Sequence, residues 1–206
     1  MPEFNSLIEG YRRFRADNYQ VQKQRWSELA EGQEPPVMLI GCCDSRVDPA
    51  TIFDTRPGQV FTLRNVANLV PPFETGGGRH GASAAIEFAV VDLKVRHVVV
   101  MGHGACGGIA AALQGDDCGV PGHSFIDSWM AIICEARDRV IAAAPEDPQR
   151  ALELEGVRVS LQNLRTFPFV REREEAGDLK LHGAFFAIAE GVLHVLDEAT
   201  GEFAPA

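Results

Sequence analysis

The chain lacks the features that mark membrane-spanning or secreted proteins. No apolar run approaches the roughly 20 residues that a helix needs to cross a bilayer. The first thirty residues are interspersed with arginine, lysine, glutamate and aspartate, which is unlike a signal peptide. Basic residues are scarce, with 19 against 29 acidic ones and a net charge of −10, which argues against nucleic acid or an anionic membrane surface as the main partner. We therefore expect a cytoplasmic protein.

Sequence repeats, low-complexity tracts and disorder-like linkers are also missing from the 206 residues. This length suits one substantial α/β domain, so we predict a single domain over residues 1–206. The glycine run at residues 76–78 has no lysine at the spacing of a phosphate-binding loop, and a turn before a helix is the simpler interpretation.

The five cysteines are an odd number, which in a chain without a secretion signal favours reduced thiols. We interpret Cys43, Cys118 and Cys134 as small apolar side chains. Cys42 and Cys106 differ, because each lies beside a second type of metal ligand.

The first candidate site follows an apolar run at residues 37–40, which predicts a buried strand of a parallel sheet. Directly after it come Cys42, Asp44 and Arg46 at alternate positions. Alternate residues of an extended segment point the same way, so all three could line one crevice. Ligand sites of open α/β sheets lie at the carboxyl ends of their strands.

A second apolar run, residues 98–101, ends in the same manner at His103, with Cys106 three residues later and a helical pattern following. Two thiolates and one imidazole form a Cys₂His set that suits zinc, with a carboxylate or a water in the fourth place. Cys106 would start its helix, where the helix dipole favours the thiolate.

The Cys-x-Asp-Ser-Arg motif followed by His-x-x-Cys resembles the β-class carbonic anhydrases, in particular their plant-type active site. Residues 64–73 and 81–90 are similar to connecting segments of the same family, and the resemblance is close over about residues 30–115. It implies a lyase that catalyses the reversible hydration of carbon dioxide to bicarbonate and a proton. It also implies one zinc ion per subunit, held by Cys42, His103 and Cys106, with hydroxide on the zinc as nucleophile.

The resemblance also implies roles for the neighbouring polar residues. Asp44 would accept a hydrogen bond from the hydroxide, and Arg46 would keep the Asp44 carboxylate ionised. In a closed form, Asp44 would instead become the fourth zinc ligand. Gln33 lies at the position of the glutamine that donates to substrate in plant-type members.

An apolar substrate such as carbon dioxide needs a dry pocket. The family pattern places Phe61, Val66, Phe88 and Gly104 at its lining. Phe88 stands where plant-type members carry a tyrosine, so it can line the pocket but cannot donate a hydrogen bond.

Some bacterial members hold a regulatory bicarbonate through a Trp–Arg–Tyr trio. The matching residues here are Leu39, Arg64 and Phe186, so we expect no such locked form.

The order of elements predicts an α/β fold with a mainly parallel central sheet flanked by helices. Two closing strands around residues 190–191 form a hairpin that adds an antiparallel edge strand. Residues 1–30 have the pattern of a helical arm, with an apolar stripe at three- and four-residue steps. In the family such helices pack on a dimer partner, so the resemblance implies a homodimer or homotetramer, with no nucleic acid or membrane partner.

Two other functions remain open at this stage. A hydrolase of the same fold that acts on carbonyl sulfide or carbon disulfide could share the metal set. A non-catalytic structural zinc protein could use a closed Cys₂HisAsp shell, although Arg46 would then have no evident purpose.

Overall fold

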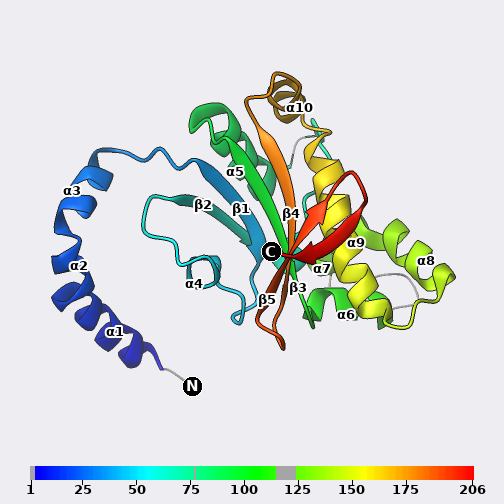
Figure 1. Ribbon diagram of the computed structural model, residues 1–206, viewed down its shortest axis with the longest axis horizontal. Helices are drawn as coiled ribbons and strands as arrows, with labels where there is room; N and C mark the ends of the chain where they lie inside the picture. The colour runs from blue at the N-terminus through cyan, green and yellow to red at the C-terminus, as the bar shows by residue number, and fades with distance from the viewer. Residues whose placement is uncertain (1–2, 77, 115–123) are drawn as a thin grey trace. The chain divides into compact units, whose positions relative to one another are not determined.

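A computed structural model describes residues 3–76, 78–114 and 124–206 of the chain (Figure 1). It divides into two compact units, residues 1–34 and residues 35–206. Among the described residues, no helix is both long and apolar enough to cross a membrane.

The N-terminal unit consists of three short helices, α1 (Phe4–Ala16), α2 (Asn18–Val21) and α3 (Lys23–Glu31). The helical arm is interrupted at Asp17 and again at Gln22. Three rings, Phe14, Tyr19 and Trp26, lie with centroids 5.7 to 6.3 Å apart and join the helices. None of the helix residues is buried, and the apolar stripe is exposed at Phe4, Leu7, Tyr11 and Val21.

The second unit is built on a six-stranded sheet with the spatial order β2-β1-β3-β4-β5-β6. Its strands are β1 (Val37–Cys42), β2 (Val60–Asn65), β3 (His97–His103), β4 (Lys180–Ala187), β5 (Val192–Asp197) and β6 (Glu202–Pro205). The first four strands are parallel, and β5 and β6 are antiparallel. The predicted fold class is confirmed, and β6, which the sequence did not reveal, takes the edge beyond β5.

Helices connect and cover the strands. They are α4 (Pro49–Ile52), α5 (Gly81–Glu87), α6 (Gly107–Gln114), α7 (Ser124–Met130), α8 (Cys134–Ala143), α9 (Pro148–Leu164) and α10 (Pro168–Glu175). Short 3₁₀ turns lie at η1 (Val66–Asn68) and η3 (Ala131–Ile133), and α5 continues as one π turn, η2 (Phe88–Asp92). Local sequence explains two of the helix starts, because Asp48 caps α4 and Asp147 caps α9, each with a proline as the first helical residue.

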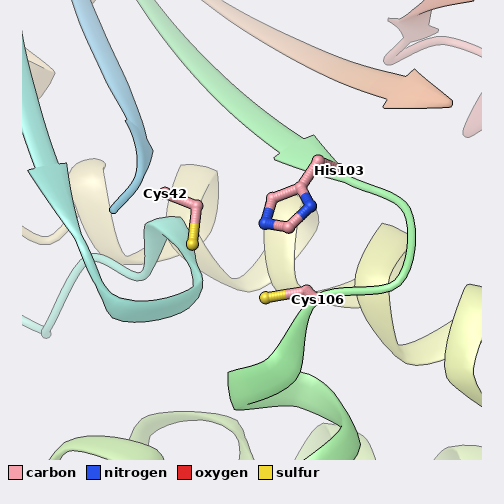
Figure 2. Close-up of side chains that lie close together, drawn as sticks. All are labelled: Cys42, His103 and Cys106. Carbon is pink, nitrogen blue, oxygen red and sulfur yellow. The ribbon is translucent and has the colours of Figure 1, made fainter. Parts of the chain in front are cut away.

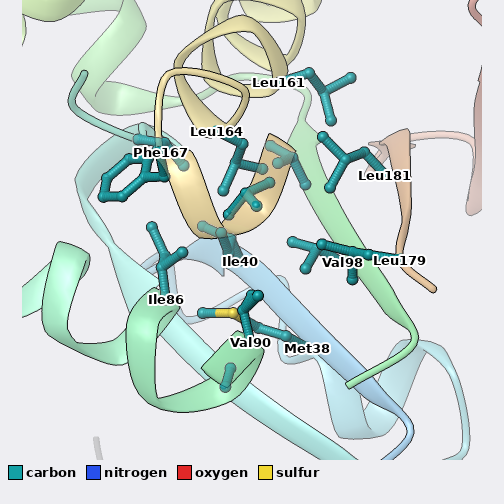
Figure 3. Close-up of a cluster of buried hydrophobic side chains, with 14 of the residues drawn as sticks. Met38, Ile40, Ile86, Val90, Val98, Leu161, Leu164, Phe167, Leu179 and Leu181 are labelled. Atoms are coloured by element: carbon teal, nitrogen blue, oxygen red, sulfur yellow. The ribbon is translucent and has the colours of Figure 1, made fainter. Parts of the chain in front are cut away.

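The main core lies between one face of the sheet and helices α5, α9 and α10 (Figure 3). Met38, Ile40 and Val98 face it from the strands, and Leu161 and Leu164 face it from α9. On the opposite face, Leu39, Met101 and Ala184 form a smaller cluster to which α4 contributes Ile52. A third cluster joins α6 and α8 to the start of α9. Buried apolar strands on this scale are typical of parallel sheets.

Candidate metal centre

Three ligand side chains meet at the carboxyl ends of two neighbouring strands. Cys42 ends β1, His103 ends β3, and the two strands pair in parallel. Cys106 lies directly before α6. A sulfur from each cysteine and a ring nitrogen of His103 lie within 4.8 Å of one another (Figure 2). The predicted convergence of the two strand ends is therefore confirmed.

The turn between the second and third ligands is tight. Ala105 has a φ of 54°, in the left-handed region that residues other than glycine seldom occupy. The Gly104 N–H donates to the Phe186 carbonyl at 3.0 Å, and the Cys106 carbonyl accepts from Ala110 N–H at 2.9 Å. These bonds fix the turn at both ends, so the His103 and Cys106 side chains are directed to the same point.

The donor set fits zinc. Cys42, His103 and Cys106 are 5, 1 and 2% exposed. His103 Nδ1 lies 3.0 Å from the Gly104 carbonyl and so carries the ring hydrogen, which leaves Nε2 as the acceptor atom. This Nε2 is buried and has no hydrogen-bond partner within the described part of the chain. A metal ion held with the two sulfurs would satisfy it.

The two thiols are prepared for a metal to different degrees. A hydrogen bond from the Cys106 thiol holds the pKa of Cys42 well below its ordinary value. The same bond, together with burial, raises the pKa of Cys106. Thiolates are the form that ligates metals, so a metal held by both sulfurs would take the place of this hydrogen bond.

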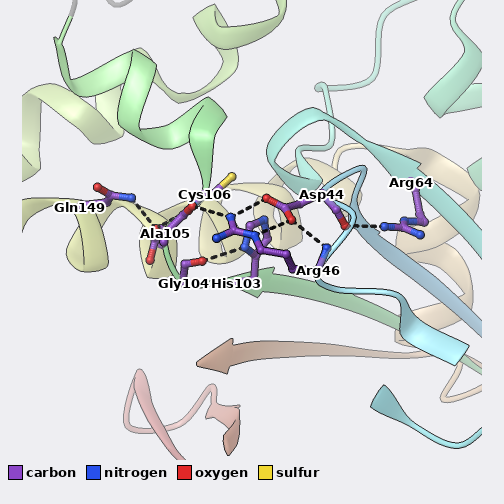
Figure 4. A network of polar contacts seen from close by, with 9 residues as sticks. Asp44, Arg46, Arg64, His103, Gly104, Ala105, Cys106 and Gln149 are labelled. Atoms are coloured by element: carbon purple, nitrogen blue, oxygen red, sulfur yellow. Dashed lines mark hydrogen bonds and ion pairs between the residues drawn. The ribbon is translucent and has the colours of Figure 1, made fainter. Parts of the chain in front are cut away.

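Beside this centre, Arg46 binds the carboxylate of Asp44 through two parallel hydrogen bonds. Arg46 Nε donates to Oδ1 at 2.9 Å and Nη2 donates to Oδ2 at 2.7 Å, while Nη2 also donates to the Ala105 carbonyl at 3.0 Å (Figure 4). This guanidinium holds the pKa of Asp44 well below its usual range. Asp44 thus stays ionised at neutral pH, and its carboxylate is not one of the three grouped ligands.

The route by which Asp44 and Arg46 meet differs from the expected one. The prediction of an extended segment with alternating side chains is wrong past residue 43, because the chain turns there. Val47 N–H donates to the Asp44 carbonyl at 3.2 Å, and Arg46 N–H donates to Asp44 Oδ1 at 3.0 Å. The turn brings the guanidinium back onto the carboxylate two residues earlier.

Arg64, at the end of β2, holds the loop that carries these residues. Its Nε donates to the Cys42 carbonyl at 2.8 Å and its Nη2 to the Asp44 carbonyl at 2.6 Å. Its Nη1 forms an ion pair with Asp48 at 3.1 Å. All three nitrogens of the guanidinium are engaged, so Arg64 has a structural role at the end of β2.

Sequence reasoning missed Glu153 on α9. This side chain is 4% exposed, and its carboxylate accepts from Cys106 N–H at 2.9 Å and from Gln149 Nε2 at 3.1 Å. Burial raises the pKa of Glu153. The available signal was an acidic residue on the helix face that also carries Val157 and Ser160, both buried.

The predicted pocket residues lie in different places. Phe61 pairs in register with Met38, four residues before Cys42, so it lies roughly 13 Å down the sheet from the metal ligands. Its ring is 5.9 Å from that of Phe88, centroid to centroid. Val66, in contrast, packs on the first turn of α6. A Cβ added at Gly108 in that turn would lie 2.9 Å from Val66 Cγ1.

Gly104 lines a cavity that is described below. Gln33 belongs to the N-terminal unit. The roles of these five residues toward substrate stay predictions.

Two of the remaining cysteines depart from expectation. Cys43 is a free and exposed thiol, not a buried apolar side chain. Cys134 is disulfide-bonded, so the expectation of reduced thiols is wrong at this position. Cys118 lies outside the described residues.

Comparison with known proteins identifies the family to which this site belongs. The family model described as carbonic anhydrase matches residues 37–193, which include all three ligands. The structure of the β-carbonic anhydrase CcaA superposes with a TM-score of 0.90 and 31% identity, over 98% of this chain and 91% of that one. The chain belongs to the β-class carbonic anhydrase family.

Two further β-carbonic anhydrases are similar to it. One of the tetrameric enzymes from the ascomycete Sordaria macrospora superposes with a TM-score of 0.81 and 31% identity, over 94% of this chain and 96% of that chain. The mitochondrial β carbonic anhydrase 6 of Arabidopsis thaliana is 35% identical over 86% of this chain. The chain spans 62% of the length of that plant relative. The Cys42, His103 and Cys106 site is the one typical of zinc in this family.

Proposed function

We propose that this chain catalyses the zinc-dependent, reversible hydration of carbon dioxide to bicarbonate and a proton. The observation that carries the proposal is the convergence of Cys42, His103 and Cys106 beside an Asp44 carboxylate that Arg46 keeps ionised. Zinc, when bound by three protein ligands, lowers the pKa of a water molecule and so supplies the nucleophile for hydration.

The chain's own residues contribute orientation and a hydrogen-bond acceptor. Because Arg46 occupies both oxygens of Asp44 with two short bonds, the carboxylate has one orientation and remains an acceptor across the neutral range. Asp44 accepts a hydrogen bond from the nucleophilic water and thereby directs its lone pair toward carbon dioxide. In a closed form, Asp44 would release Arg46 and serve as a fourth protein ligand of the metal.

Three ligands, not four, favour catalysis over a structural zinc site. Structural sites normally have four protein ligands and no open position. Within the described residues, the group offers three ligand atoms, and the neighbouring Asp44 carboxylate is held by Arg46. Hydrolysis of carbonyl sulfide or carbon disulfide by the same centre is the alternative reaction, and Gln33 and the family-like segment 64–73 favour carbon dioxide.

We further propose that the active form is a dimer or tetramer. The similar enzymes from Sordaria macrospora are tetrameric. The apolar stripe of α1 is exposed in the single chain, and a second copy could bury it. Phe61 and Phe88 lie away from the metal ligands of their own chain. A second copy would supply Gln33, Phe61 and Phe88 to the pocket, so an isolated monomer would be inactive. We propose a single domain, a cytoplasmic location, and no nucleic acid or membrane partner.

Stopped-flow hydration of carbon dioxide from about pH 6 to pH 9 tests the activity. We expect the zinc-loaded protein to hydrate carbon dioxide, and the Asp44→Asn variant to bind zinc normally but to be about 100-fold slower. Asp92→Asn, an exposed carboxylate on η2, is the matched control and should behave as wild type. Stoichiometric zinc without hydration at any pH would refute the proposal, and a parallel assay with carbonyl sulfide would then examine the alternative.

A further inference from the structure

We propose a second ligand site in this chain: a cavity between Arg46 and Arg150 that binds a small planar oxyanion, either a carboxylate or bicarbonate. The cavity measures about 230 Å³ and is lined by the two arginines, by Gly104 and Ala105, and by residues 187–190 of the β4–β5 hairpin. None of the three metal ligands lines it. The lining side chains between the arginines are mostly glycine and alanine, which leave the space open for a ligand.

Arg150 supplies a fixed positive charge. Its guanidinium carbon lies 3.9 Å from the ring centroid of Phe185, which is fully buried on β4. Stacking on a ring fixes the plane of a guanidinium and leaves its N–H donors at the edge. No ion pair joins Arg150 to any carboxylate in residues 3–76, 78–114 or 124–206. Glu153, three residues along α9, interacts with this charge without forming an ion pair, so the N–H donors of Arg150 remain available to a ligand.

Arg46 supplies a second set of donors to the lining of the cavity. Its bonds to Asp44 and Ala105 use Nε and Nη2, and its Nη1 donates to no described residue. The Asp44 pair fixes the plane of this guanidinium as well. Two fixed guanidiniums with free edges match the paired oxygens of a carboxylate or bicarbonate, which arginine binds through parallel hydrogen bonds.

One negative group, Glu190, also lines the cavity. It is exposed at the tip of the hairpin, where water screens its charge, whereas Arg150 is half-buried. This arrangement favours a small, singly charged anion over a larger polyanion.

The site differs from the Leu39, Arg64 and Phe186 positions considered above. Arg64 uses all its nitrogens on Cys42, Asp44 and Asp48. An anion between Arg46 and Arg150 would instead touch the guanidinium that orients Asp44, so occupancy would act on the metal centre. Bicarbonate is the member of this class that the proposed reaction releases. That choice of occupant rests on the proposed function, whereas the anion site does not.

Calorimetric titration of the zinc-loaded protein with acetate, at constant ionic strength and about pH 8, tests the site. We expect Arg150→Gln to weaken acetate binding at least about tenfold, because it removes the charged donors. Acetate that binds at the metal should bind equally well to this variant. Only the difference between the two isotherms therefore measures acetate binding at the Arg150 site. Arg171→Gln, which removes an exposed arginine from α10, should leave the isotherm unchanged. Identical isotherms for Arg150→Gln and wild type would overturn the proposal.

Arg150→Lys covers the case in which Arg150→Gln does not fold. It keeps the charge but loses the planar fork, so binding should weaken about threefold or more, and wild-type affinity in this variant would overturn the proposal. The two proposals can fail separately. Acetate binding that depends on Arg150, in a protein that does not hydrate carbon dioxide, refutes only the proposed activity; normal hydration without such binding refutes only the anion site.

Discussion

Ser160 is one of two described side chains of α9 that hold the loop beside the metal centre, together with Asn163, whose Nδ2 donates to the Val70 carbonyl at 2.8 Å. Ser160 is fully buried, and its hydroxyl accepts from Val70 N–H and donates to the Asn68 carbonyl, both at 3.2 Å. Val70 is also fully buried and Asn68 is 3% exposed, so water cannot replace the hydroxyl at either group. Asn68 ends η1, the turn that packs on the start of α6.

Ser160→Ala removes one hydroxyl and leaves two buried backbone groups without partners. Each such group costs about 1 to 3 kcal/mol. Both bonds are at the long end of the normal range, so we expect a total loss of about 2 to 4 kcal/mol in the free energy of unfolding. With an m-value of about 2 to 3 kcal/mol/M, the urea midpoint would fall by about 1 M.

Urea unfolding followed by circular dichroism measures this change. Zinc and protein concentrations must be equal for all variants, because metal binding and association both add to apparent stability. Ser27→Ala is the matched control, since Ser27 is exposed on α3 and its hydroxyl donates to the Lys23 carbonyl within the same helix. The control should change stability by less than about 0.5 kcal/mol. A Ser160→Ala value as small as that of the control would show that the two backbone groups do not depend on this hydroxyl.

Two further predictions concern the sheet. Gly183→Ala would place a Cβ 2.9 Å from Leu196 Cβ and 3.0 Å from Val157 Cγ1, so thermal or urea unfolding should show a loss of about 1 to 3 kcal/mol, and unchanged stability would contradict the close packing. His182 has a lowered pKa because it is buried and lies near His97 and Lys180, with only Glu198 opposing. As the pH decreases, His182 therefore takes up a proton in the unfolded chain before it does so in the folded chain. The free energy of unfolding should fall as the pH drops below about 6.5 toward the folded-state pKa of His182. His182→Gln should reduce that fall in urea titrations at pH 7 and pH 5, and an equal fall in both proteins would exclude His182 as its source.

Much of the fold was predictable because parallel strands and their crossovers leave strong local patterns. The apolar runs at residues 37–40 and 98–101 lie within β1 and β3. Elements with weaker patterns were missed. The polar stretch after Pro168 forms α10, and the four-residue β6 is too short to show any alternation.

The metal ligands were predictable for the same reason. A parallel sheet brings the carboxyl ends of adjacent strands together. Ligand residues at the ends of two such strands therefore lie close to one another. Cys42 and His103 follow this rule, whereas Cys106 reaches the site through the tight turn at Ala105.

Tertiary structure decided what surrounds those ligands. The turn that returns Arg46 to Asp44, the carboxylate of Glu153 under Cys106, and the stacking of Arg150 on Phe185 depend on backbone turns and on contacts between residues up to 47 positions apart. The hydrophobic periodicity of a sequence predicts only which face of a helix or strand is buried. It does not predict which polar group lies on the neighbouring element. Hydrogen bonds and stacked charges need such a partner at a specific distance and angle, which exists only after the core has brought α9 against β3 and β4.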